Sequence, residues 1–171
     1  MRKIHLQNGD SFTSTRAETS SGEIKTPWHA DSQTCLDAQY VDMAKNRLIL
    51  VIDDSATVRK ILETCLTREG FEVKSFPDGV EAMRWFTEPG ARIPHLVILD
   101  IGLPKLDGYE VARHLKMKPQ LSNTVIIMLS RRDGVIDKLK GRLAGAKVYL
   151  TKPFKTQDLL SIIEAHIGIP V

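Results

Sequence analysis

Short apolar runs that end in polar side chains constrain the fold of this chain more than any other feature. The runs LILVI, LVIL and VYL are continuous and too short for helices, which is typical of strands buried on both faces of a parallel sheet. The polar residues that follow them are Asp53 and Asp54, Asp100, and Lys152. The carboxyl ends of parallel strands share one sheet edge, where ligands bind in open α/β folds. The sequence therefore predicts one pocket with three carboxylates and one ammonium group.

Such a pocket has chemical consequences. Two carboxylates about 4 Å apart repel by roughly 4 kcal/mol at an effective dielectric constant of 20. A fold tolerates this repulsion when a cation, a proton or the lysine offsets it. Oxygen-rich acidic sites suit Mg²⁺, which takes one or two carboxylates and keeps several waters. The remaining aspartate can then act as a nucleophile toward a phosphoryl group.

Strands and helices are expected to alternate from residue 47 onward. The predicted strands cover residues 48–52, 72–76, 96–99, 125–129 and 148–150. Four predicted helices begin at the caps Asp54 or Ser55, Asp78, Asp107 and Thr156, and the helix before the last strand begins at about Asp133. Five strands alternating with five helices predict a doubly wound α/β fold with a parallel sheet.

The segments VIDDSATVRK, LVILDIGLPKLDGYEVAR, VIIMLSRRDG and VYLTKPF resemble the receiver domain of two-component response regulators. The resemblance covers roughly residue 46 to the C-terminus. It implies a flavodoxin-like fold with strand order 2-1-3-4-5 and five flanking helices. That order places the first and third strands at the topological switch point, in agreement with the pocket predicted from the strand ends.

The resemblance also assigns roles to individual residues. Asp100, which ends a continuous apolar run, is the expected phospho-acceptor. The ligands expected for Mg²⁺ are Asp53, Asp54, Asp100 and the backbone carbonyl of Gly102. Lys152 is expected to neutralise Asp100 and to bind a phosphoryl oxygen, and its bond to Pro153 is expected to be cis. Ser130 and Tyr149 resemble the switch residues of the family.

The domain is expected to signal by contact with another protein. Ser130 and Lys152 are expected to move toward the phosphoryl oxygens, and Tyr149 is expected to fill the space that Ser130 leaves. This movement repacks the face made by the fourth helix, the fifth strand and the fifth helix, which a downstream effector protein would bind. The phosphoryl donor is expected to be a histidine kinase or a phosphotransfer protein. We expect a stand-alone regulator, not an enzyme, of the kind found in chemotaxis or type IV pilus motility.

Composition limits the partners. A formal net charge of +3 and the lack of a recognisable helix-turn-helix argue against direct nucleic-acid binding. No apolar stretch approaches the roughly 18 residues that span a bilayer, and a cytoplasmic setting is expected. Residues 1–45 are polar and lack long-range periodicity, so they are expected to form a disordered extension, or a docking segment, ahead of a receiver domain at 46–171.

Two other functions share parts of this pattern. Phosphatases of the haloacid-dehalogenase type also use an aspartyl nucleophile, Mg²⁺ and a lysine, but their nucleophile usually stands in a DxD-type motif on the first strand. Here Asp53 and Asp54 are adjacent. An unphosphorylated scaffold receiver is the other alternative, and the full set of acids, hydroxyl and lysine argues against it. Arg131 and Gly102 depart from the residues common in the family, and both positions bear on the lifetime of the phosphoryl group.

Overall fold

A computed structural model describes residues 47–170, and the extension predicted for residues 1–45 lies outside this range. The strands are β1 (Leu48–Ile52), β2 (Glu72–Phe76), β3 (Leu96–Asp100), β4 (Val125–Ser130) and β5 (Val148–Thr151). The helices are α2 (Ala56–Arg68), α3 (Gly79–Trp85), α4 (Gly108–Met117), the short 3₁₀ helix η1 (Pro119–Leu121), α5 (Val135–Leu143) and α6 (Thr156–Ile167). The five predicted strands and five predicted helices are all present.

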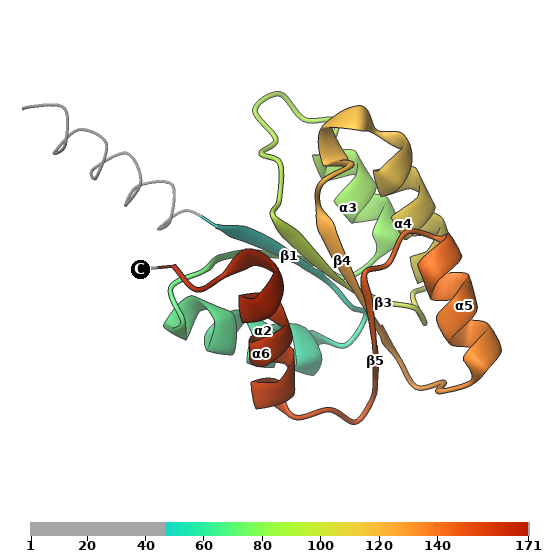
Figure 1. Cartoon of the computed structure of the whole chain (residues 1–171). Helices are drawn as coiled ribbons and strands as arrows, with labels where there is room; N and C mark the ends of the chain where they lie inside the picture. Colours follow the sequence, from blue (N-terminus) through green and yellow to red (C-terminus); the bar gives the residue numbers. More distant parts are fainter. Residues whose placement is uncertain (1–46, 171) are drawn as a thin grey trace, which may run out of the picture.

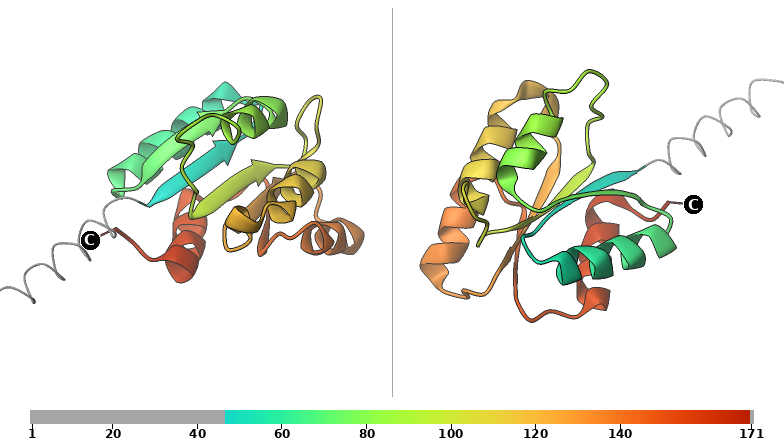
Figure 2. Two further views of the ribbon diagram at one scale, coloured as in Figure 1. Left: turned by 90° about the horizontal axis from the view of Figure 1, so that it is seen from above. Right: turned by 180° about the vertical axis from the view of Figure 1, so that it is seen from behind.

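The five strands form one parallel sheet in the order β2-β1-β3-β4-β5. Helices α2 and α6 cover one face of the sheet, and α3, α4 and α5 cover the other (Figure 1 and Figure 2). The chain reverses its direction of winding between β1 and β3, which are neighbours in the middle of the sheet. The flavodoxin-like fold predicted from the sequence is therefore confirmed.

Burial of alternate strand residues explains why the sheet has helices on both faces. Leu48, Leu50 and Ile52 belong to the core under α3 and α4, whereas Ile49 and Val51 belong to the core under α2 and α6. All five side chains of β1 are buried, as in a strand covered on both sides. The continuous apolar run in the sequence thus corresponds to a central strand.

Side-chain caps fix the starts of three helices close to the sheet edge. The side chains of Ser55, Asp78 and Asp107 accept backbone hydrogen bonds at the beginnings of α2, α3 and α4. The prediction that Thr156 caps the last helix is wrong. Thr156 is the first residue of α6, and the N-cap is Lys155, which makes no side-chain capping bond.

The helix predicted from Asp133 begins two residues later, at Val135, with Gly134 at the N-cap and no side-chain capping bond. Asp133 therefore lies in the β4–α5 loop, and this loop is longer than the sequence pattern indicates. None of the helices within residues 47–170 is both long and apolar enough to cross a membrane.

Candidate functional site

The predicted pocket lies at the carboxyl edge of the sheet, where β1 and β3 end. It has a volume of about 550 Å³. Its lining includes all of the acidic residues, the serine and the lysine predicted from the sequence, and it also includes Arg131, Arg132 and Tyr109. Of the predicted site residues, Tyr149 alone is not part of this lining. The strand ends therefore bring together side chains that are separated by up to 99 positions in the sequence.

Lys152 is the centre of the pocket's hydrogen bonding. Its ammonium group donates to Asp53 Oδ2 and to Asp100 Oδ1, each at 2.7 Å. The lysine side chain is 17% exposed, and those of Asp53 and Asp100 are 1% and 9% exposed. Because this cation is shared by two buried carboxylates, removing it leaves two negative charges without an adjacent partner. The peptide bond between Lys152 and Pro153 is cis, as the resemblance implies.

Burial affects the pKa values of Asp100 and Lys152 in different ways. Burial raises the pKa of Asp100 above its usual value, and repulsion from Asp53 and Asp54 acts in the same direction, against the opposing effect of Lys152. Burial alone lowers the pKa of Lys152, but its hydrogen bonds to Asp100 and Asp53 outweigh burial and raise that pKa. The lysine is therefore charged at neutral pH, and added positive charge near Asp100 would favour the carboxylate form.

The loop between β1 and α2 holds Asp53 firmly. Its Oδ1 accepts a hydrogen bond from the backbone N–H of Ser55 at 2.9 Å, so both of its carboxylate oxygens have partners. Arg59 in the first turns of α2 donates to the backbone carbonyls of Asp53 at 2.7 Å and Asp54 at 3.2 Å. Sequence reasoning missed this clamp. The only signal for it is a basic residue one turn after the helix N-cap.

Asp54 differs from its neighbour because its side chain is exposed at the mouth of the pocket. Within residues 47–170, no group of three or more His, Cys, Asp or Glu side chains is gathered closely enough to hold a metal ion. The ammonium group of Lys152 lies between Asp53 and Asp100 instead. The donor set nevertheless suits Mg²⁺, because three carboxylates line one pocket and repel one another there.

The second oxygen of Asp100 faces Gly102 in the loop after β3. A Cβ atom at Gly102 would lie 3.2 Å from Asp100 Oδ2, so the glycine spares this oxygen a tight contact. Farther along the loop, a Cβ atom at Gly108 would collide with the backbone carbonyl of Asp100. Gly108 therefore allows the start of α4 to pack directly against the end of β3. The close approach of α4 to β3 thus depends on Gly108.

Arg132, in the β4–α5 loop, connects the two predicted switch residues through its backbone. Its N–H donates to Ser130 Oγ at 2.9 Å, and its carbonyl accepts from the hydroxyl of Tyr149 at 2.9 Å. Ser130 is buried at the end of β4, whereas the half-buried Tyr149 ring packs against Gly141 of α5. A single residue thus links Ser130 to Tyr149. The sequence does not reveal this connection because backbone groups make it.

Two further residues, one on α4 and one in the loop after β3, were not identified from the sequence. Tyr109 on α4 donates a hydrogen bond from its hydroxyl to the backbone carbonyl of Asp137 at 3.3 Å, and burial followed by the neighbouring Tyr149 raises its pKa. Lys105 forms an ion pair with the capping carboxylate of Asp78 at 2.6 Å and has a positive φ of 69°. The Lys105–Asp78 pair fastens the loop after β3 to the start of α3, and the Tyr109 hydrogen bond fastens α4 to α5.

Comparisons with known proteins agree with this geometry. The family described as "Response regulator receiver domain" matches residues 49–164. Protein PilG of Pseudomonas aeruginosa is 40% identical over 119 residues, which cover 70% of this chain and 86% of PilG. The probable transcriptional regulator ycf27 of Guillardia theta is 40% identical over 131 residues, and the match spans only 48% of its length. The chemotaxis response regulator CheY4 of Vibrio cholerae superposes with a TM-score of 0.66 at 28% identity, covering 71% of this chain and 98% of CheY4.

Proposed function

We propose, on the premise that this chain belongs to the response regulator receiver domain family, that Asp100 accepts a phosphoryl group from a histidine kinase or a phosphotransfer protein. Members of this family are signalling regulators of two-component systems, not enzymes. Membership of the family therefore argues against the phosphatase alternative. The observation that carries the proposal is the ammonium group of Lys152 shared between Asp53 and Asp100 at the sheet edge.

The open oxygen of Asp100 supports its role as the nucleophile. Oδ1 is bound to Lys152, whereas Oδ2 faces the side-chain-free Gly102. In the proposed step, Oδ2 forms a bond to phosphorus while the bond from phosphorus to the histidine nitrogen of the donor breaks. The electron pair of that bond stays on the imidazole. Lys152 remains beside Asp100 and offsets negative charge on the phosphoryl oxygens.

Receiver domains bind Mg²⁺ at their acidic pocket. The ligands proposed here are Asp53, Asp54, Asp100 and the backbone carbonyl of Gly102, all of which line the pocket. Mg²⁺ would supply positive charge that offsets the approach of an anionic phosphoryl donor to the carboxylates. Asp54 lines the pocket and is exposed, whereas Asp53 is already held in place by Ser55.

The proposed switch begins at Ser130. Its hydroxyl proton is available for a phosphoryl oxygen, because Oγ accepts rather than donates in its bond to Arg132 N–H. Movement of Ser130 toward the phosphoryl group would release that N–H and shift the Arg132 carbonyl that holds the Tyr149 hydroxyl. The Tyr149 ring, packed on Gly141, would then move with the β4–α5 loop. The face formed by α5, β5 and α6 would change in shape, and a downstream effector protein would read the change.

The pathway is proposed from the relatives. PilG by its name, and CheY4 by its description as a chemotaxis response regulator, support a role in pilus-based motility or chemotaxis. We propose that the chain acts as a stand-alone regulator through protein contact in the cytoplasm, and not by binding nucleic acid directly. Residues 46–171 would form the receiver domain and residues 1–45 a separate extension. The family match to residues 49–164 supports this boundary.

Beryllofluoride bound to Asp100 mimics a phosphoryl group and allows the switch to be tested. Amide chemical shifts recorded with and without beryllofluoride and Mg²⁺ should change most, outside the pocket, in the β4–α5 loop, α5 and β5. An Asp100→Asn variant treated in the same way is the matched control and should show no such changes. Remote changes confined to α2 and α3 would contradict the proposed switch. A complete lack of response in the wild-type protein would favour the unphosphorylated scaffold.

A further inference from the structure

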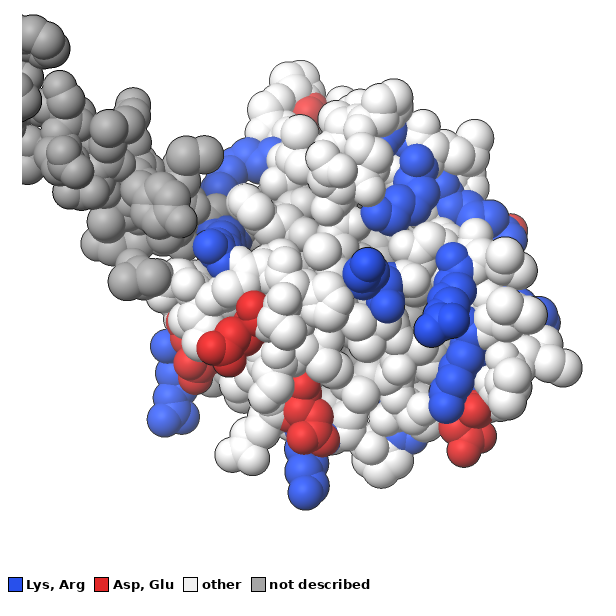
Figure 3. Space-filling view, in the orientation of Figure 1, with Lys and Arg blue, Asp and Glu red and all other residues white. Residues whose placement is uncertain are grey.

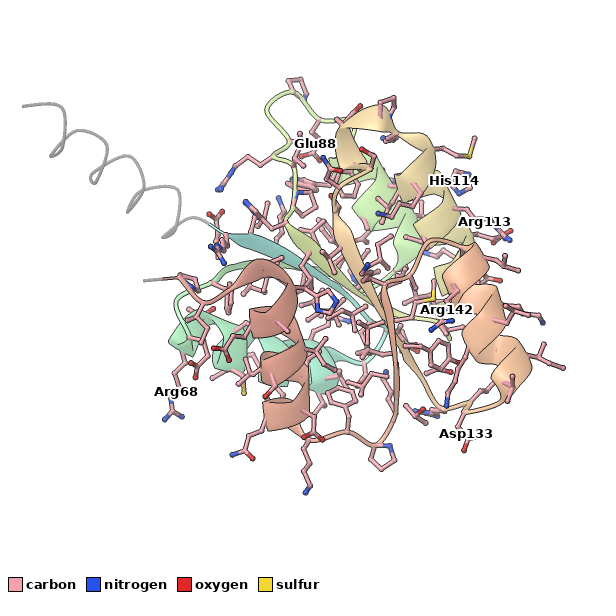
Figure 4. The ribbon with its side chains drawn as sticks, in the orientation of Figure 1. Arg68, Glu88, Arg113, His114, Asp133 and Arg142 are labelled. Atoms are coloured by element: carbon pink, nitrogen blue, oxygen red, sulfur yellow. The ribbon has the colours of Figure 1, made fainter. Side chains whose placement is uncertain are left out.

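Helix α5 is held to the domain by few contacts. Gly141 is the one residue of this helix that is buried. Four aliphatic side chains on the helix are each more than half exposed: Val135, Ile136, Leu139 and Leu143. The N-cap, Gly134, makes no side-chain capping bond, and Asp133 before it points away from the ribbon in Figure 4. Few buried apolar contacts are the mark of an element that shifts at low cost.

The space beside α5 also leaves room for such a shift. A hollow of about 560 Å³ lies between α5 and β5, and Tyr149 is among the residues that line it. Long basic side chains, those of Lys138, Arg142 and Lys147, line the rest of it. Blue side chains lie over this part of the surface in Figure 3, and Figure 4 shows Arg142 between the helix and the strand. Long side chains of this kind can follow a moving helix, so the hollow does not lock α5 in place.

A single tyrosine fastens α5 to the rest of the domain by a hydrogen bond. The hydroxyl of Tyr109 on α4 donates to the backbone carbonyl of Asp137 at 3.3 Å. Within residues 47–170, no other side chain donates a hydrogen bond to the backbone of α5. Burial, and next the neighbouring Tyr149, raises the pKa of Tyr109, so its hydroxyl keeps its proton and acts as a donor at neutral pH. The position of α5 therefore depends on this bond more than on any other side-chain hydrogen bond.

Tyr109 stands on an element that is fixed relative to Asp100. It follows Gly108, whose close contact with the backbone carbonyl of Asp100 ties the start of α4 to the end of β3. Tyr109 also lines the pocket at Asp100, together with Ser130 and Arg132. Its ring thus lies between the pocket and α5, and it belongs to the side of the molecule that carries the phospho-acceptor.

We propose that Tyr109 is a positioning residue that holds α5 in its unphosphorylated position and thereby opposes the binding of a phosphoryl group at Asp100. This role rests on the proposed function. In the proposed switch, Ser130 moves and displaces Arg132, and α5 follows Arg132 closely in the chain. Because Tyr109 stays with β3 while Asp137 moves with α5, the hydrogen bond between them breaks. The coupling is reciprocal, so removal of the bond strengthens binding at Asp100.

Beryllofluoride titration of a Tyr109→Phe variant of the full chain tests this role. The variant loses the hydroxyl and keeps the ring. At a fixed Mg²⁺ concentration, its apparent Kd for beryllofluoride, measured by amide chemical shifts, should be about fivefold lower than that of the wild-type protein, the effect of one ordinary hydrogen bond. Without beryllofluoride, the α5 amide signals of the variant should already lie part of the way toward their positions in the wild-type adduct. A tyrosine with a merely structural role would change neither the affinity nor the signals in this direction.

Thr87→Val is the matched control, because it removes a hydroxyl that donates to the backbone carbonyl of Arg84 at 2.6 Å, after α3. Its Kd for beryllofluoride should equal that of the wild-type protein. If the wild-type protein responds to beryllofluoride and Tyr109→Phe binds it equally or more weakly, the role of Tyr109 is overturned and the proposed function stands. A wild-type protein that gives no response would contradict the proposed function and, with it, the role of Tyr109.

Discussion

Replacing Lys152 by methionine isolates the electrostatic role of its ammonium group. Methionine is of comparable length and reach but carries no charge, so Asp53 and Asp100 would lose the cation that each now contacts at 2.7 Å. Both carboxylates are buried, and within residues 47–170 the Ser55 N–H is the one remaining partner of the Asp53 side chain. The change therefore leaves two like charges close together in a poorly solvated pocket.

The expected loss of stability is large. Removing one partner of a buried ion pair typically costs about 3–5 kcal/mol. The Lys152 side chain is 17% exposed and the pocket is open at Asp54, so water can relieve part of the penalty. We therefore expect the lower end of that range, about 3 kcal/mol at pH 7. Mg²⁺ at 100 times its Kd should add about 2.7 kcal/mol to the stability of the variant, which offsets most of the loss relative to the metal-free wild-type protein.

Urea unfolding at pH 7 without Mg²⁺ measures this loss. Lys155→Met is the matched control because Lys155 is exposed in the same loop, and its effect should stay within about 0.5 kcal/mol. In an Asp100→Asn background the cost of Lys152→Met should fall by about 1 kcal/mol or more, because only one carboxylate is then left without the ammonium group. A non-additive effect of this size is expected only when the Lys152 and Asp100 side chains are in contact.

The pH dependence of the loss has a definite sign. Burial already raises the pKa of Asp100, and removing Lys152 would raise it further. An acid whose folded-state pKa is raised destabilises the fold above that pKa, and the penalty disappears as the pH falls and the acid is protonated. The cost of Lys152→Met should therefore shrink as the pH falls toward 4. A cost below 0.5 kcal/mol at pH 7, or strict additivity with Asp100→Asn, would refute the shared-cation reasoning.

Three further predictions follow from single contacts. Asp54→Ala should weaken Mg²⁺ binding, measured by titration of Trp fluorescence, with little change in stability, because Asp54 is exposed; unchanged affinity would exclude Asp54 as a ligand. Tyr149→Phe should cost about 1 kcal/mol in unfolding experiments by removing the bond to the Arg132 carbonyl, and it should leave phosphoryl uptake intact. Asp100→Asn should raise the melting temperature at pH 7, because burial raises the pKa of Asp100, and this gain should vanish below pH 3.8; a gain that persists at low pH would contradict this explanation.

The sequence predicts the fold and the location of the pocket because a few strong constraints determine both. The apolar run before Asp53 is continuous, so it had to be a strand buried on both faces, and β1 is such a strand. Asp78 and Asp107 each precede a glutamate by three residues, which fixes the starts of α3 and α4. Because parallel strands end at the same edge of the sheet, Asp53, Asp100 and Lys152 can be placed together there before their contacts are known.

The contacts themselves depend on information that side-chain patterns do not carry. The link between Ser130 and Tyr149 runs through the backbone of Arg132, whose residue type is irrelevant to it. Asp53 is buried, with its carboxylate bound to Lys152 and to the Ser55 N–H, and Asp54 is exposed in the loop after it, although the sequence treats them alike. Thr156 matched a capping pattern, but the backbone enters α6 one residue earlier.

The most direct test of the account is the chemical identity of the phosphorylated residue. The full-length protein would be incubated with Mg²⁺ and acetyl phosphate, reduced with borohydride to trap the acyl phosphate, digested and mapped by mass spectrometry. We expect one modified residue, Asp100, whose carboxylate is the one with an oxygen facing Gly102. Asp100→Asn should abolish the modification and keep the fold. Modification of Asp53 or Asp54, or none at all under conditions in which Mg²⁺ binds, would contradict the account.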